Sequence, residues 1–182
     1  MRPMMHAVKR LFGDVQIEGA EVGVDTGYHA FQILSDWGDG LRLLHLIDIN
    51  PDIKDVVNEK LQEFNNYQLY IGDSVELANT CSDESLEFVY LDDDHSYDGV
   101  TASCEAWWSK LKIGGVFGGH DYCKVIRKSA DPTSKAVDDF IMNKIPFANP
   151  LQYLHTEHND WWFVKQTGEW TVNREGEEIC TI

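Results

Sequence analysis

The sequence of 182 residues has little positive charge. Lys and Arg total 15 against 31 Asp and Glu, which gives a formal net charge of −16. A surface with this balance repels polyanions, so nucleic acid and anionic membranes are excluded as main partners. Long apolar runs are also missing, both as the core of an N-terminal signal and as a membrane span. These absences predict a cytoplasmic protein.

Paired cysteines and linkers are absent as well. The four cysteines are scattered, with no CxxC pair and no zinc-site spacing, which is typical of free thiols in a reducing compartment. No low-complexity linker or internal repeat interrupts the chain. Because the length suffices for one α/β core and is too short for two, residues 1–182 are predicted to form a single domain.

Apolar runs of strand-like composition alternate with segments of helical period, which predicts an α/β fold with a parallel sheet and crossover helices. The expected strands are 17–22, 41–48, 67–71, 86–92, 114–120, 151–156 and 161–166, and the expected helices are 27–37, 51–64, 74–81, 97–111 and 133–144. A short turn at 158–160 joins the last two strands, so they should form an antiparallel hairpin. Trp107 falls at core spacing in its helix, and one of Trp161 and Trp162 is expected to be exposed.

Ligands of such sheets bind at the carboxyl ends of the strands. The first expected strand is followed by Glu21, Gly23 and Gly27, where glycines allow a tight turn and close approach to a ligand. The diphosphate fingerprint GxGxxG is absent, and Asp25 adds negative charge to the loop. The loop therefore favours a cationic or zwitterionic ligand, with a plain strand-to-helix turn as the alternative.

Acids also follow the next two strands. Asp48 can accept both hydroxyls of a ribose because one carboxylate takes two donors, while Asn50 is the better cap for the following helix. Asp73 and Ser74 can meet an adenine amino group and ring nitrogen, or can cap the helix that they precede.

Together with these strand ends, the blocks LDDDHSYDGV and GGVFGGHDY resemble class I S-adenosylmethionine-dependent O-methyltransferases. The two blocks are similar to the macrocin O-methyltransferase and cephalosporin-hydroxylase-like group, and more distantly to catechol O-methyltransferase. The resemblance spans about residues 17 to 166 and implies a Rossmann-like, seven-stranded, mostly parallel sheet with an antiparallel C-terminal pair and helices on both faces. The cofactor S-adenosylmethionine is then expected at Glu21, Gly23, Gly27, Asp48, Asp73, Ser74 and Asp92.

Metal-dependent members of this family bind Mg²⁺ through an Asp after the fourth strand and an Asp after the fifth, which correspond to Asp92 and Asp121. The amide ligand of the catechol enzyme is missing, because Tyr122 follows Asp121 here. The third ligand is therefore open among four side chains, of which His120 is our choice. They are Asp93, Asp94, His95 and His120.

The resemblance also implies a general base. The lysine of the catechol enzyme stands three residues after the fourth-strand Asp, and this offset leads to His95, a side chain that titrates near neutral pH. We therefore predict His95, Asp92 and Asp121 as catalytic residues. A solvated acidic turn, or a cap for the helix near Tyr97, is the alternative, but acidic and imidazole groups crowded after a buried strand repel one another unless a cation or proton compensates.

The predicted reaction is methyl transfer to a hydroxyl of a sugar or phenolic small molecule, with Mg²⁺ assistance. The larger members of the family that the sequence resembles carry extra N-terminal helices that cover the acceptor, whereas only about fifteen residues precede the first strand here. The resemblance therefore implies an acceptor site that is either open, which suits a sugar on a larger glycoside, or completed by a second subunit of a homo-oligomer. The alternatives are a nicotinamide-dependent oxidoreductase, which the missing GxGxxG disfavours, and a non-catalytic nucleoside-binding module.

Overall fold

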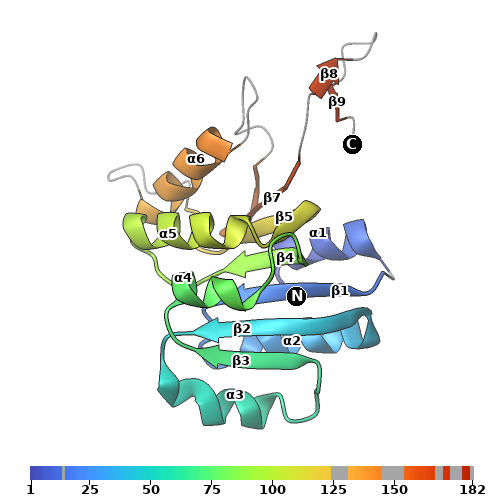
Figure 1. The fold of residues 1–182 in the computed structure, drawn as a ribbon, viewed down its shortest axis with the longest axis vertical. Coiled ribbons are helices and arrows are strands. Elements are labelled where there is room, and N and C mark those ends of the chain that lie inside the picture. Colours follow the sequence, from blue (N-terminus) through green and yellow to red (C-terminus); the bar gives the residue numbers. More distant parts are fainter. Residues whose placement is uncertain (14, 124–130, 145–153, 167–169, 173–177, 181–182) are drawn as a thin grey trace.

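The structure is a computed structural model (Figure 1) that describes residues 1–13, 15–123, 131–144, 154–166, 170–172 and 178–180. Its centre is a seven-stranded sheet in the order β3-β2-β1-β4-β5-β7-β6. The strands are β1 (Ile17–Val22), β2 (Leu41–Asp48), β3 (Tyr67–Ile71), β4 (Leu86–Leu91), β5 (Leu111–Gly119), β6 (His155–Glu157) and β7 (Asp160–Val164).

Strands β1 to β5 pair in parallel, and β7 runs antiparallel to both of its neighbours, β5 and β6. The predicted mostly parallel sheet with an antiparallel C-terminal pair is therefore confirmed. β5 begins three residues earlier than expected, and residues 151–153 of the sixth expected strand lie outside the described residues. A separate two-stranded sheet of β8 (Trp170–Val172) and β9 (Glu178–Cys180) was not predicted.

Helices cover both faces of the seven-stranded sheet, as expected. One face carries α1 (Pro3–Phe12), α2 (Tyr28–Trp37) and α3 (Lys54–Lys60); the other carries α4 (Ser74–Leu77), α5 (Tyr97–Trp108) and α6 (Pro132–Lys144). In Figure 1, α2 passes behind the sheet and α4 lies in front of it. Short 3₁₀ turns, Pro51–Ile53 and Ala78–Thr80, replace the start of one expected helix and the end of another, and a third, Gly38–Gly40, follows α2.

Helix α1 was not predicted from the sequence. It has Pro3 in its first turn, where a missing N–H costs nothing, and it buries Met4, Met5 and Val8 on one side. These signals resemble those of the helices that were predicted. The helix packs on β5 and β7 and covers that end of the sheet.

The position of α1 corrects the prediction for the paired tryptophans. Trp161 and Trp162 are both buried, with exposed fractions of 1% and 7%. Successive residues of a strand point to opposite faces, and here each face is covered: Trp162 belongs to the apolar cluster that contains α1, and Trp161 to the cluster of α5 and α6. Trp107 is fully buried, as predicted.

Two other features concern the whole chain. None of the described helices has the length and apolar character that a membrane crossing requires. Of the cysteines, Cys81, Cys104 and Cys123 are free thiols, the first two buried.

Candidate active site

A cavity of about 960 Å³ opens at the carboxyl ends of β1 to β4. Six of the seven residues predicted to bind the cofactor line it: Glu21, Gly23, Asp48, Asp73, Ser74 and Asp92. Gly27, the seventh, is the N-cap of α2 with a left-handed φ of 72° and does not line the cavity. Strand-end position, together with the family resemblance for Asp92, therefore identified residues from four separate segments that converge on one space.

Gly23 is required by the packing of the backbone itself. Its φ is 88°, and a Cβ at this position would lie 2.0 Å from the carbonyl oxygen of Asp92. Any larger residue would push apart the loops that follow β1 and β4. The glycine thus explains the tight turn without reference to a ligand.

Asp48 shapes the same loop. Its Oδ2 accepts hydrogen bonds from the backbone N–H groups of Val24 (2.9 Å) and Asp25 (3.0 Å), and its Oδ1 accepts one from Asn50 (2.8 Å). Asn50 in turn accepts a hydrogen bond from the N–H of Asp52, so Asn50 is the cap, as expected. Asp48 fixes the glycine loop and, because each carboxylate oxygen has two lone pairs, retains acceptor capacity towards the cavity.

Asp73 caps helix α4, which is the second of the two roles predicted for it. Its Oδ1 accepts from the N–H groups of Val75 and Glu76 at 2.9 and 3.1 Å. Ser74 instead donates to Asp93, with 2.7 Å between Oγ and Oδ2.

The acids that follow Asp92 are engaged in local contacts. Asp93 Oδ2 also accepts a hydrogen bond from Ser103 at 2.7 Å. Asp94 Oδ1 accepts one from the N–H of Ser96 at 2.7 Å, which lowers the pKa of Asp94. Ser96 caps α5 through the N–H of Gly99 (3.1 Å), so the capping alternative accounts for part of the HSYD segment. Asp93 and Asp94 are therefore weaker candidates for a metal ligand than the two histidines.

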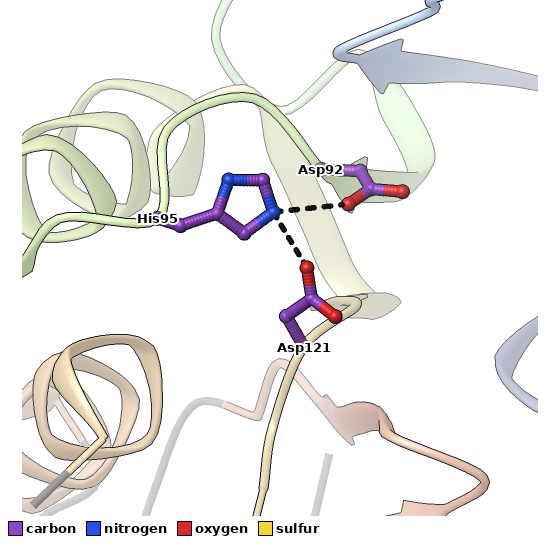
Figure 2. A group of neighbouring side chains, drawn as sticks. All are labelled: Asp92, His95 and Asp121. Atoms are coloured by element: carbon purple, nitrogen blue, oxygen red, sulfur yellow. Dashed lines mark ion pairs between the residues drawn. The ribbon is translucent and has the colours of Figure 1, made fainter.

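Asp92, His95 and Asp121 converge at the ends of β4 and β5 (Figure 2). His95 Nε2 points between the carboxylates, 2.6 Å from Asp121 Oδ2 and 3.8 Å from Asp92 Oδ1. His120 also contacts both carboxylates, with its Nδ1 3.0 Å from Asp121 Oδ1 and 3.9 Å from Asp92 Oδ1. Asp121 has a φ of 59°, an uncommon backbone conformation for a residue with a side chain.

The electrostatics of this cluster favour a cation. Burial raises the pKa of Asp92, and the nearby charge of Asp121 raises it further, against the opposing effects of His120, Arg2 and His95. An ionised carboxylate there is poorly compensated, and an ion between Asp92 and Asp121 would relieve the cost. One ligand atom each of Asp92, His95 and Asp121 lies within 4.8 Å of the other two, so the residues present fit a divalent ion.

Two cavity residues were missed by the sequence analysis. His29, in the first turn of α2, is buried and its Nδ1 lies 3.1 Å from Glu21 Oε1. Within the described part of the chain, Glu21 Oε2 and His29 Nε2 have no hydrogen-bond partner. The other residue is Arg2, which reaches the cavity from the start of α1. A polar residue two positions after Gly27 could have indicated His29, but no local signal marks Arg2.

The sheet order and the strand-end cavity define the fold of class I S-adenosylmethionine-dependent methyltransferases. A family model described as a methyltransferase domain matches residues 20–122, more than half of the chain. The chain belongs to this methyltransferase family, which confirms the resemblance seen in the sequence.

Solved structures share the fold at low identity. A protein from Corynebacterium glutamicum is 15% identical, with a TM-score of 0.64 over 92% of this chain and 82% of its own. Cofactor-bound Rv0187 from MTB is 14% identical, with a TM-score of 0.67 over 92% and 82% of the two chains. MycE, a methyltransferase of the mycinamycin biosynthetic pathway in complex with Mg, SAH and mycinamycin VI, is 16% identical, with a TM-score of 0.64 over 90% of this chain and 49% of its own, so the present chain spans about half of MycE. No curated protein matches the sequence.

Proposed function

We propose that the protein transfers the methyl group of S-adenosylmethionine to a hydroxyl of a sugar or phenolic small molecule with the help of a divalent ion. The observation that carries this proposal is the convergence of Asp92, His95 and Asp121 beside a cavity of about 960 Å³, which has room for a nucleoside cofactor. MycE, which shares the fold, was crystallised with Mg and SAH, and this supports the same pairing of cofactor and metal here.

The cavity suits a cationic cofactor. Asp48 stands at the end of β2 with acceptor capacity left for ribose hydroxyls. Glu21 adds a buried carboxylate with one unpartnered oxygen among the described residues, and Asp92 also lines the cavity. A sulfonium cofactor meets negative charge at both places, whereas a dinucleotide diphosphate would be repelled, and this disfavours the nicotinamide alternative.

Methyl transfer to a hydroxyl requires alignment of the acceptor and removal of its proton. A divalent ion at Asp92 and Asp121 would lower the pKa of a hydroxyl bound to it. His95 would complete the set of metal ligands, because its Nε2 lies within reach of both carboxylates. His120, our first choice from the sequence, then orients Asp121 through its Nδ1.

His95 cannot use Nε2 for a metal and a proton at once. Without an ion, its 2.6 Å contact with Asp121 makes it a general base whose protonated form Asp121 stabilises. The two roles make opposite predictions for chelation: methyl transfer stops if His95 is a ligand of the ion and continues if His95 acts as a base without any metal.

The test is transfer of labelled methyl from S-adenosylmethionine to a panel of catechols and glycosides, with Mg²⁺ and with excess chelator. We expect transfer that requires the ion, and loss of Mn²⁺ binding in His95→Ala but not in His120→Ala. Loss of Mn²⁺ binding only in His120→Ala would restore the original ligand set. Thermal shifts with S-adenosylhomocysteine but no transfer to any acceptor would support the binding-module alternative, and a shift with NAD alone would support the oxidoreductase.

A further inference from the structure

The cavity has a strong imbalance of charge. Seven carboxylates line it: Glu21, Asp25, Asp48, Asp73, Asp92, Asp93 and Asp94. Among its described lining residues, Arg2 is the sole Lys or Arg. S-adenosylmethionine carries a carboxylate as well as its ammonium and sulfonium groups. That carboxylate is repelled by most of the wall and finds a single fixed cation.

The guanidinium of Arg2 has hydrogen-bonding capacity left. Its contacts are long, 3.5 Å from Nη2 to Asp92 Oδ2 and 3.6 Å from Nη1 to Asp160 Oδ1, and its side chain is 30% exposed. A guanidinium has five N–H donors in a planar fork that matches the two oxygens of a carboxylate. Two long contacts leave that fork available to a ligand in the cavity.

Arg2 lies close to the negatively charged Glu21 and its partner His29. Glu21 pairs with Tyr90 across β1 and β4, and the ring of His29 lies 4.5 Å from the ring of Tyr90. The guanidinium of Arg2 lies over the same Tyr90 ring, 5.6 Å from its centre. Arg2 and the Glu21–His29 pair therefore share one wall of the cavity, a positive group next to a negative one. An α-amino acid presents the complementary pair, a carboxylate and an ammonium on one carbon.

We propose that Arg2 binds the carboxylate of the cofactor's amino-acid end, with the charge of Glu21 favouring the adjacent ammonium. The inference rests on the proposed function, because it requires S-adenosylmethionine in this cavity. It assigns a cofactor contact to α1, a helix outside the residues matched by the family model.

Asp160 holds Arg2 in place. This carboxylate is 1% exposed and accepts hydrogen bonds from the Tyr90 hydroxyl (2.9 Å) and from the N–H of Met4 (3.1 Å) in the first turn of α1. It thereby ties the start of α1 to β7, 156 residues away in the sequence. The guanidinium is fixed from outside the cavity, so less side-chain entropy is lost when it binds a ligand.

Calorimetry with two ligands tests the proposal: S-adenosylhomocysteine and its decarboxylated analogue, which keeps the ammonium. Wild type should bind S-adenosylhomocysteine about 10- to 100-fold more tightly than the analogue, the range for a charged hydrogen-bonded contact. Arg2→Met should lower the affinity for S-adenosylhomocysteine to that of the analogue and leave the analogue unchanged. Arg2→Lys should keep part of the difference, because it retains the charge without the fork. Arg10→Met, on the exposed side of the same helix, is the matched control and should behave as wild type.

Other binding results would overturn either the role of Arg2 or the proposed function, and the two cases can be told apart. Equal affinity of wild type for both ligands, or equal weakening of both by Arg2→Met, would overturn the role of Arg2 while leaving the proposed function intact. Absence of any binding of S-adenosylhomocysteine to the folded wild-type protein would overturn the proposed function as well. Because the analogue reports binding in every variant, a misfolded Arg2→Met would be recognised by loss of both ligands, and Arg2→Lys then decides by its residual difference.

Discussion

Acidic residues at the two ends of the sheet differ in how closely they are paired with cationic side chains. At the amino ends of the strands, Glu18 accepts hydrogen bonds from Arg42 (2.9 Å from Nε) and pairs with His45 at 2.7 Å, and Glu87 pairs with Lys112. At the carboxyl ends, Asp92 lies 3.5 Å from Arg2, and Asp92 and Asp121 share His95. Acids paired within the chain contribute to the fold, whereas acids without sufficient partners need a ligand.

The pKa values of Glu18 and Asp92 also differ between the two ends of the sheet. Burial raises the pKa of Glu18, but the hydrogen bonds and charges of His45 and Arg42 outweigh burial and leave it lowered. Burial raises the pKa of Asp92, and there the nearby cations do not overcome it. Groups with a perturbed pKa in a cleft are typical of functional sites. The pKa of Asp92, in the cavity, is raised, whereas the pKa of Glu18, at the other end of the sheet, is lowered.

The largest expected effect is the loss of the metal site. Asp121→Asn should weaken Mn²⁺ binding, measured by calorimetry or electron paramagnetic resonance, by about 100-fold or more, because it replaces an anionic ligand with a neutral amide. Methyl transfer should fall at least as far, while the affinity for S-adenosylhomocysteine changes little. Glu18→Gln, an acid-to-amide change at the other end of the sheet, should leave Mn²⁺ binding unaltered. Unchanged Mn²⁺ affinity in Asp121→Asn would remove the basis for the metal.

The next effect concerns the cofactor. Asp48→Ala should weaken binding of S-adenosylhomocysteine by about 1.5 to 3 kcal/mol, because it removes a charged acceptor and also releases the backbone N–H groups of Val24 and Asp25. Calorimetry measures this change, and Asp83→Ala, an exposed acid paired with Lys110, is the control. Wild-type affinity in Asp48→Ala would show that Asp48 only supports the loop.

A smaller effect is expected at the amino ends. Glu18→Gln should reduce the free energy of unfolding by about 1 kcal/mol at neutral pH, since one of its partners, Arg42, is largely exposed and its contribution is screened. The folded pKa of Glu18 is lowered, so its contribution is present above the unfolded pKa and is lost as the pH falls through the folded pKa. Urea unfolding of both proteins should therefore differ at pH 7 and converge in acid. A difference that persists in acid would contradict this assignment.

The smallest expected effect is a gain in stability rather than a loss. Asp92→Asn should raise the melting temperature of the metal-free protein by about 2 °C at pH 7, because it removes a charge that is costly to bury. The folded pKa of Asp92 is raised, so wild type regains relative stability as the pH falls and the carboxyl is protonated in the folded state first. The advantage of Asp92→Asn should therefore shrink in acid and reverse when Mg²⁺ is added. A variant less stable than wild type without metal would show that the charge is already compensated within the chain.

Much of the fold was predictable because its signals are local. Alternating apolar runs located the seven strands of the main sheet, strand-end position identified Asp48, and the family resemblance added Asp92 and Asp121. The prediction that one of Trp161 and Trp162 is exposed was wrong, because α1, from the far end of the sequence, covers the face of β7 that carries Trp162. The small sheet of β8 and β9 also had no recognised signal.

The sequence by itself determined the parallel α/β fold and the acids at the strand ends, because the hydrophobic period and the alternation of strands with helices depend on neighbours in the chain. The tertiary structure alone decided which groups face those acids. Arg2 reaches Asp92 and Asp160 across 90 and 158 positions of sequence, and His95 meets Asp121 across two strand ends. Charge compensation depends on distances of a few ångströms between residues far apart in the chain, and such distances exist only once the sheet and its helices have packed.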